Sequence, residues 1–148
     1  MKAQEFLHPK GELDIVILGA DGNTKEKIHI NNLVVQTGRQ FIADRIISST
    51  NFDPMTHMAV GEDTNAVDLT DTALGNELYR QSFDSATRND NVVTFVTTYA
   101  PGDATGAITE AGIFNAASGG TMLCRTEFNV VNKAADDTMI ITWTVTIS

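Results

Sequence analysis

The stretch Gly106–Ser148, GAITEAGIFNAASGGTMLCRTEFNVVNKAADDTMIITWTVTIS, determines the fold that this sequence predicts. In its final run, apolar side chains occupy the odd positions and threonines occupy most of the even ones. The apolar set is Met139, Ile141, Trp143, Val145 and Ile147. This alternation is typical of a β-strand with one buried face, and β-branched threonine suits the exposed face. Trp143 is therefore expected in the core.

Two more runs precede this strand. One covers Ile108–Asn115, and the next begins at Met122. In this second run, one side consists of Met122, Cys124, Thr126 and Phe128. The opposite side consists of Leu123, Arg125 and Glu127. An AlaAlaSerGlyGly loop joins the two runs, and its paired glycines permit positive φ. The region predicts an antiparallel meander whose apolar side forms half of a sandwich core.

The N-terminal part predicts a hairpin followed by a helix. Asp21-Gly22 is a strong hairpin signal, placed between apolar residues 13–18 and a return strand over 24–35. Over residues 37–49 the period changes to that of a short helix, with Thr37 and Gln40 at the spacing of a capping box. Its predicted buried stripe is Phe41, Ile42, Ile46 and, more weakly, Ala43 and Ile47, and its predicted exposed residues are Arg39, Asp44 and Arg45.

Further strands are expected at residues 55–61, 78–85 and 91–99. The whole pattern predicts an all-β protein, an antiparallel β-sandwich of about seven to eight strands with one short helix near residues 37–49. Residues 1–11 have mixed charge and no periodicity, so we interpret them as an N-terminal arm. Residues 12–148 form a single predicted domain.

Composition limits the classes of partner. The chain has 148 residues and a net charge of -9, which disfavours nucleic acid or an anionic membrane as the main partner. The single cysteine, Cys124, cannot form an intrachain disulfide, and its place in an alternating run predicts a buried, inert thiol. With no signal sequence and no long apolar run, we expect a soluble protein made in a reducing cytoplasm.

Catalytic and metal-binding signals are weak. His8, His29 and His57 lie far apart without a second ligand at metal-binding spacing, and no zinc, P-loop or nucleophile-elbow motif is present. The acidic loop with Glu62, Asp63, Asp68 and Asp71 offers oxygen ligands for Ca²⁺ but fails the EF-hand pattern. We therefore interpret it as a solvated loop in which Asp68 or Asp71 caps a helical turn before Leu74.

Glu110 is a carboxylate inside a predicted strand, followed by Ala111 and Gly112. Such a position suggests a bulge where a second backbone comes close. The structural interpretation, which we favour, is that Glu110 accepts hydrogen bonds from neighbouring amides or pairs with Arg125. No catalytic, cofactor-binding or metal-binding residue is assigned.

Three segments resemble small structural proteins of tailed bacteriophages, of the tail-fibre-like and fibre-attachment kind. They are NNLVVQTGRQFIADRI (Asn31–Ile46), THMAVGEDTNAVDLTDTALGNEL (Thr56–Leu78) and GAITEAGIFNAASGGTMLCRTEF (Gly106–Phe128). The most specific piece is ThrGluAlaGlyIlePhe with the GlyGlyThrMetLeu hairpin that follows. It is similar to the strand-turn-strand of virion-attachment domains in phage tail fibres.

The resemblance implies a non-enzymatic assembly role in the virion, for a protein made in the host bacterial cytoplasm. Copies would join one another, with a trimer as the leading expectation, and would bind portal or neck, tail or capsid proteins. No cofactor is implied. Physically, the arm and the Asp21-Gly22 hairpin could reach neighbours, for example by adding a strand to a sheet edge.

Other functions stay open at this point. The protein could be a capsid decoration (cement) protein, or a host glycan- or receptor-binding module that uses Tyr79 or Tyr99 as an aromatic platform. An enzyme such as a small hydrolase is the remaining class, and turnover abolished by replacing one carboxylate would identify it.

Overall fold

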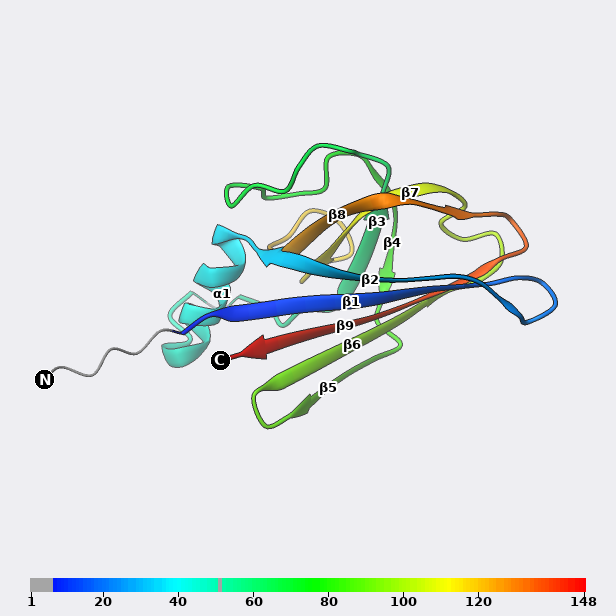
Figure 1. Cartoon of the computed structure of the whole chain (residues 1–148). Coiled ribbons are helices and arrows are strands. Elements are labelled where there is room, and N and C mark those ends of the chain that lie inside the picture. Colours follow the sequence, from blue (N-terminus) through cyan, green and yellow to red (C-terminus); the bar gives the residue numbers. More distant parts are fainter. Residues whose placement is uncertain (1–6, 51) are drawn as a thin grey trace, which may run out of the picture.

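The computed structural model describes residues 7–50 and 52–148, which form one nine-stranded antiparallel sheet and one helix (Figure 1). The elements are β1 (Pro9–Leu18), β2 (Thr24–Val34), α1 (Gln36–Ile47), β3 (His57–Gly61), β4 (Glu77–Ser82), β5 (Ser85–Asn89), β6 (Val92–Tyr99), β7 (Gly106–Phe114), β8 (Met122–Lys133) and β9 (Thr138–Ile147). The all-β class and the single helix are confirmed. Most of the predicted arm, residues 1–6, lies outside the described residues, and the arm's last residues, Pro9 to Gly11, already belong to β1.

The sheet is a curled half-barrel rather than a clear sandwich. Its strand order is β4-β3-β7-β8-β2-β1-β9-β6-β5. β2 pairs along its length with β1, but only its last two residues, Leu33 and Val34, pair with β8. Because this joint is so short, the two halves of the sheet can fold toward each other across a shared core while remaining one sheet (Figure 1).

The core lies on the concave face of the sheet. Met139, Ile141, Trp143 and Val145 are buried there, as the alternation in β9 predicts. Facing residues from β1 and from β7–β8 complete the cluster, among them Leu13, Ile15, Ile17, Ile108, Ile113, Cys124 and Val131. Burial of this continuous apolar face is the main force that holds the curled sheet together.

The convex face of β3, β7 and β8 is also covered. The segment 62–76 crosses this face, and Leu74 packs there in a second cluster with Ala59, Phe114 and Met122. As a result, both sides of β8 are buried near its start, with Arg125 beneath the 62–76 segment and Leu123 in the main core. The prediction that Met122 and Cys124 share one side of the strand is wrong, because a register shift between Ile113 and Phe114 in the β7–β8 ladder leaves Met122 in the second cluster and Cys124 in the core.

The turns follow the glycine signals. Gly22, in the β1–β2 hairpin, has φ 81°, and Gly119 and Gly120, in the β7–β8 loop, have φ 61° and 75°. β5 is an additional strand that the sequence pattern did not separate from its neighbours. It pairs with β6 across a tight turn at Asp90, whose φ is 54°.

The predicted face of α1 is partly correct, because Phe41 and Ile42 pack against the core while Arg39 and Arg45 are exposed. The predicted cap and the predicted burial of Ile46 and Ile47 are wrong. The N-cap residue is Val35, without a side-chain cap, and the Thr37 hydroxyl instead donates to the Met122 carbonyl oxygen at 2.7 Å. Gly38 and Asp44 are the buried residues of the helix, whereas Ile46 and Ile47 are exposed. The reason lies at Gly38, where a β-carbon would overlap the backbone of Leu123, so the helix approaches β8 through its glycine rather than through Ile46 and Ile47.

No helix among the described residues is long and apolar enough to cross a membrane.

Candidate functional site

Glu110 and Arg125 form a buried ion pair between the sheet and the 62–76 segment. Glu110 lies on β7 and Arg125 on β8, and both are almost fully buried. The guanidinium donates to Glu110 Oε2 from Nη2 at 2.9 Å and from Nε at 3.1 Å. A register shift in the β7–β8 ladder between Ile108 and Glu110 turns the carboxylate toward this site. The favoured interpretation of Glu110 is therefore confirmed.

The same carboxylate fixes the segment that covers it. Glu110 accepts hydrogen bonds from the backbone N–H groups of Asp63, Gly75 and Asn76, at 3.3, 2.9 and 2.8 Å. These contacts reach both ends of the loop, so one side chain closes it over the sheet. Gly61 permits the approach, because a β-carbon there would overlap Glu110 and the Asn76 backbone.

The acidic loop binds Arg125 rather than remaining a fully solvated segment. Asp71 Oδ2 accepts from Arg125 Nη1 at 2.8 Å, and Asp63 Oδ2 accepts from Nη2 at 3.2 Å. Burial disfavours the charged guanidinium, yet the hydrogen bonds that it donates to Glu110 and Asp71 raise the pKa of Arg125. Asp68 organises the loop internally by accepting from the Thr70 amide and hydroxyl. Residues 68–71 form one hydrogen-bonded turn before Leu74, closed by the Asp71 N–H donating to the Asp68 carbonyl oxygen at 3.1 Å and capped by the Asp68 side chain, although no helix forms there.

Among residues 7–50 and 52–148, no group of three or more His, Cys, Asp or Glu side chains is arranged to hold a metal ion. The histidines lie in separate environments. His29 pairs with Asp14 at 2.8 Å on the exposed face of β1–β2, and His57 contacts the Thr56 hydroxyl at 2.7 Å. Arg125 already supplies the positive charge that the loop carboxylates face.

Other polar side chains in the core also have structural partners. The indole N–H of Trp143 donates to Asn32 Oδ1 at 3.1 Å, and the Tyr99 hydroxyl donates to the Met58 carbonyl oxygen at 2.9 Å. Burial raises the pKa of the Cys124 thiol well above its usual value, which keeps it protonated and unreactive. Lys133 is a buried lysine that sequence reasoning missed, and its ammonium donates to the Ala100 carbonyl oxygen at 3.0 Å.

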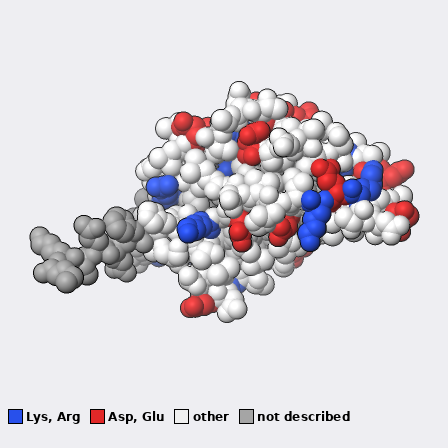
Figure 2. Space-filling model, in the orientation of Figure 1, with Lys and Arg blue, Asp and Glu red and all other residues white. Residues whose placement is uncertain are grey.

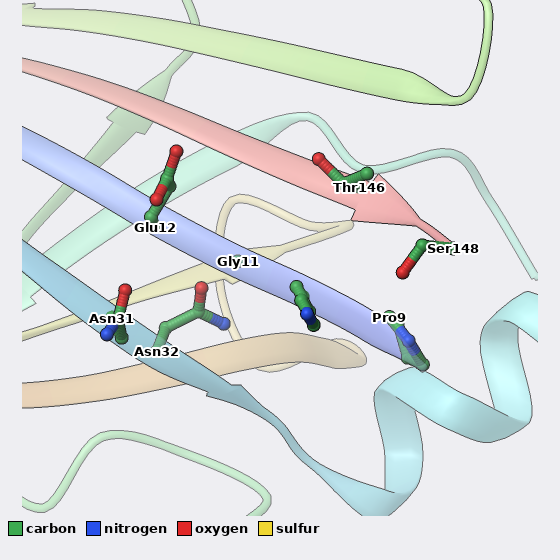
Figure 3. A pocket seen from close by; sticks show the side chains of 8 residues that line it. Pro9, Gly11, Glu12, Asn31, Asn32, Thr146 and Ser148 are labelled. Atoms are coloured by element: carbon green, nitrogen blue, oxygen red, sulfur yellow. The ribbon is translucent and has the colours of Figure 1, made fainter. Parts of the chain in front are cut away.

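A polar trough of about 650 Å³ lies across β1, β2 and β9 (Figure 3). Glu12, Asn31 and Thr146 line it together with residues near both chain ends. Gly11 has a structural reason, since a β-carbon there would overlap the Asn32 amide that binds Trp143. The glycine at this point of the trough is therefore explained by the packing of Asn32 against Trp143 in the core.

The most unusual surface lies at the end of the sheet where α1, the start of β1 and the C-terminus meet (Figure 1). We call it the α1 face and define it by Leu7, Ile42, Ala43, Ile46 and Ile47. Leu7 is 63% exposed, Ile46 is 81% exposed and Ile47 is 76% exposed. Beside it, an apolar pocket of about 310 Å³ opens between α1 and the concave side of the sheet, lined by residues that include Phe41, Met55, Phe95 and Val145.

Charge around the α1 face differs from the acidic average of the chain. Arg39 and Arg45 on α1 are exposed, and Figure 2 shows basic side chains on the visible surface next to the residues drawn in grey. An exposed apolar helix face bordered by arginines is typical of a surface that contacts another protein. The helical periodicity of residues 37–49 had predicted Ile46 and Ile47 in the core, so this exposed face was not expected.

Comparison with protein-family models, with curated proteins and with solved structures finds no match to this chain.

Proposed function

We propose that the protein is a non-enzymatic structural component of a bacteriophage virion. Copies associate as a homo-oligomer, with a trimer as the leading arrangement, and bind other virion proteins of the neck, tail or capsid. The phage assignment depends on the sequence resemblance of residues 31–46, 56–78 and 106–128. The assembly role is supported independently by the α1 face, and this face is the observation that carries the proposal.

The physical argument concerns apolar surface in water. Burying a leucine- or isoleucine-sized side chain stabilises a protein by about 1.5–3 kcal/mol. The α1 face leaves Ile46 and Ile47 without that stabilisation in the monomer, and the two are adjacent on one short helix. Association that covers them recovers this free energy, which explains why a helix directs two isoleucines away from its own core.

The remainder of the molecule suits a rigid scaffold. The most buried ionisable residues, Glu110, Arg125 and Lys133, all take part in contacts that hold loops or strand ends. Trp143 and Tyr99 are fully buried, and Tyr79, the other candidate platform, is half-buried with its ring against that of Tyr99. These observations favour a protein that is held in place over one that transforms a substrate or binds a glycan through these rings.

Multi-angle light scattering of the purified protein tests the oligomer. The expected result is a discrete species of about three chain masses, and a strictly monomeric protein over the micromolar range contradicts the proposal. Antibody labelling of purified particles by electron microscopy tests the location. We expect label at one fixed position on each particle, and particles without label contradict a virion role.

A further inference from the structure

A groove runs along the outer side of α1 and consists of two hollows that meet at Ala43. The first, of about 220 Å³, is lined by Leu7, Ile42, Ile46 and neighbouring residues. The second, of about 490 Å³, is lined by Asp44, Ile47, Thr50, Phe52 and neighbouring residues. Ala43 lines both hollows, so an extended peptide could follow them continuously.

Asp44 lies at the bottom of the second hollow with half of its carboxylate unused. Its side chain is buried, with the residue only 7% exposed. Oδ1 accepts three hydrogen bonds, from the Ser49 hydroxyl and from the amide and hydroxyl of Thr50. Oδ2 receives no hydrogen bond from any residue that the structure describes. A buried, unsatisfied acceptor is costly, and a carboxylate oxygen is best satisfied by a cationic donor.

The carboxylate remains ionised, because the hydrogen bonds from Thr50 and Ser49 lower the pKa of Asp44 despite its burial. The occupant of this hollow should therefore combine a cation for Asp44 with apolar side chains for Ile46 and Ile47. Oδ2 is covered by surrounding atoms, so the donor reaches it when a side chain of the hollow moves aside.

The N-terminal segment Met1–Phe6, MKAQEF, has this chemistry. In an extended chain alternate side chains share one side, which places Lys2 and Phe6 together with Gln4 between them. Lys2 supplies an ammonium group and Phe6 supplies a large apolar ring. Six extended residues span about 20 Å, which exceeds the width of a helix.

The path of the chain favours the groove of a neighbouring copy over the chain's own groove. The His8 N–H donates to the Ser148 carbonyl oxygen at 2.6 Å, and the Ser148 hydroxyl donates to the His8 carbonyl oxygen at 3.2 Å. The β1–β9 ladder therefore continues to residue 8, so the described chain begins as extended strand next to the C-terminus. Between Met1 and His8 the sequence has no Gly, Pro, Asn or Asp that would favour an immediate reversal onto α1.

We infer that residues 1–6 of one copy bind along α1 of the next copy, with the Lys2 ammonium on Asp44 and the Phe6 ring against Ile46 and Ile47. This inference rests on the proposed homo-oligomer and specifies how its subunits are joined. The contact is head-to-tail, and a closed ring of such contacts gives a cyclic trimer in which every groove is filled.

Disulfide trapping tests the exchange. In full-length protein carrying both Lys2→Cys and Ile47→Cys, mild oxidation should produce covalent dimers and trimers on a non-reducing gel. Native Cys124 is buried and protonated, so it does not compete. The matched control pairs Lys2→Cys with Val130→Cys, an exposed position on β8 outside the groove, and should remain monomeric. Linking only within one chain, or no more linking than in the control, overturns the inference.

A charge-reversal pair gives an independent measurement. Lys2→Glu should raise the dissociation constant of the oligomer about tenfold, equivalent to about 1.4 kcal/mol, because it places a second carboxylate at Asp44. Lys10→Glu changes an exposed lysine of β1 outside the groove and should alter the constant by less than about twofold. If both variants assemble like the native chain, the arm exchange is wrong while the homo-oligomer stands. A native chain that is itself monomeric removes the oligomer and the exchange together.

Discussion

Trp143 combines complete burial with one specific polar contact, so it determines how β9 sits against the hairpin of β1 and β2. Its neighbours across the sheet are Leu13 on β1 and Phe95 on β6, and its indole N–H reaches Asn32 on β2. The side chain thus contacts three strands that are distant in sequence. Its loss would open a cavity and also leave the Asn32 amide without its partner.

Trp143→Ala should lower the free energy of unfolding by about 3–5 kcal/mol, from lost transfer free energy plus the cavity. Urea denaturation followed by circular dichroism measures this, since the variant has no tryptophan fluorescence. Thr144→Ala, on the opposite face of β9, is the matched control and should cost less than about 1 kcal/mol. Equal losses for the two variants would contradict the assignment of the faces.

Glu110→Gln tests the buried ion pair at the same scale. The substitution preserves shape but leaves Arg125 buried without its fully buried counter-charge, and it replaces one acceptor oxygen with an amide donor that faces backbone N–H groups. We expect a loss of about 3–5 kcal/mol in the free energy of unfolding. Proteolysis within residues 62–76 should also become faster, because the loop loses its closure.

Glu127→Gln is the control, since Glu127 lies opposite Glu110 in the β7–β8 ladder but is only partly buried. It should leave both stability and the rate of loop cleavage nearly unchanged. A Glu110→Gln protein as stable as this control would show that the ion pair does not hold the loop.

At the scale of elements, the β8–β9 turn is tied to β2 by one ion pair. Both carboxylate oxygens of Asp137 accept hydrogen bonds from the Lys25 ammonium, at 3.0 and 3.1 Å, and Asp137 Oδ2 accepts a third from the Ala134 amide. The hydrogen bond from Lys25, followed by that from Ala134, lowers the pKa of Asp137 below its ordinary value of 3.8. A carboxyl with a lowered folded-state pKa stabilises the fold above its unfolded pKa.

Stability should therefore decrease as the pH falls below about 4, through the lowered pKa of folded Asp137. Asp137→Asn should remove part of this acid dependence and should be less stable than the native chain at pH 7. Asp136→Asn, at the exposed neighbouring position, should keep the native dependence. Thermal unfolding of the three proteins between pH 2 and 7 provides the comparison, and parallel curves for all three would exclude Asp137 as a contributor.

The strands were more predictable than the helix because their signal is local. Alternation in β9 and the Asp21-Gly22 turn depend on neighbouring residues, and both are confirmed. For α1, residue type predicted the extent of the helix, but its orientation depends on the contact of Gly38 with β8, far along the chain. An absent side chain gives no periodic signal, so Asp44 was predicted to face water and Ile46 and Ile47 to face the core, whereas Ile42 was placed correctly.

In the candidate site, too, the contacts with a local sequence signal were predictable and the long-range contacts were not. Pairing of Glu110 with Arg125 could be predicted, since both lie on adjacent runs of a meander. Closure of the 62–76 segment over them could not, because it depends on backbone N–H groups of Asp63, Gly75 and Asn76, which carry no signal in residue type. The exposure of the α1 face likewise emerges only once the helix has been oriented.

For the whole molecule, the short joint between β2 and β8 explains why a sandwich and a half-barrel are difficult to distinguish from sequence. Both architectures bury the same alternating residues, and they differ here in a ladder that involves only Leu33 and Val34 of β2. The joint keeps the sheet continuous. The sheet itself is curved, and α1 lies at one of its ends (Figure 1). The surface that we assign to assembly therefore arises from the way the sheet curls.

The double change Ile46→Ser and Ile47→Ser tests that assignment on the intact molecule. Both side chains are largely exposed in the monomer, so the free energy of unfolding of the dissociated chain should change by less than about 1 kcal/mol. Self-association should instead weaken markedly, since the apolar area that an oligomer would bury is removed. Sedimentation velocity over a concentration series measures the shift toward monomer. The control is Val130→Ser, which removes an exposed apolar residue elsewhere on the sheet and should associate like the native chain. If the native chain, the control and the double variant all associate equally, the interface lies away from α1.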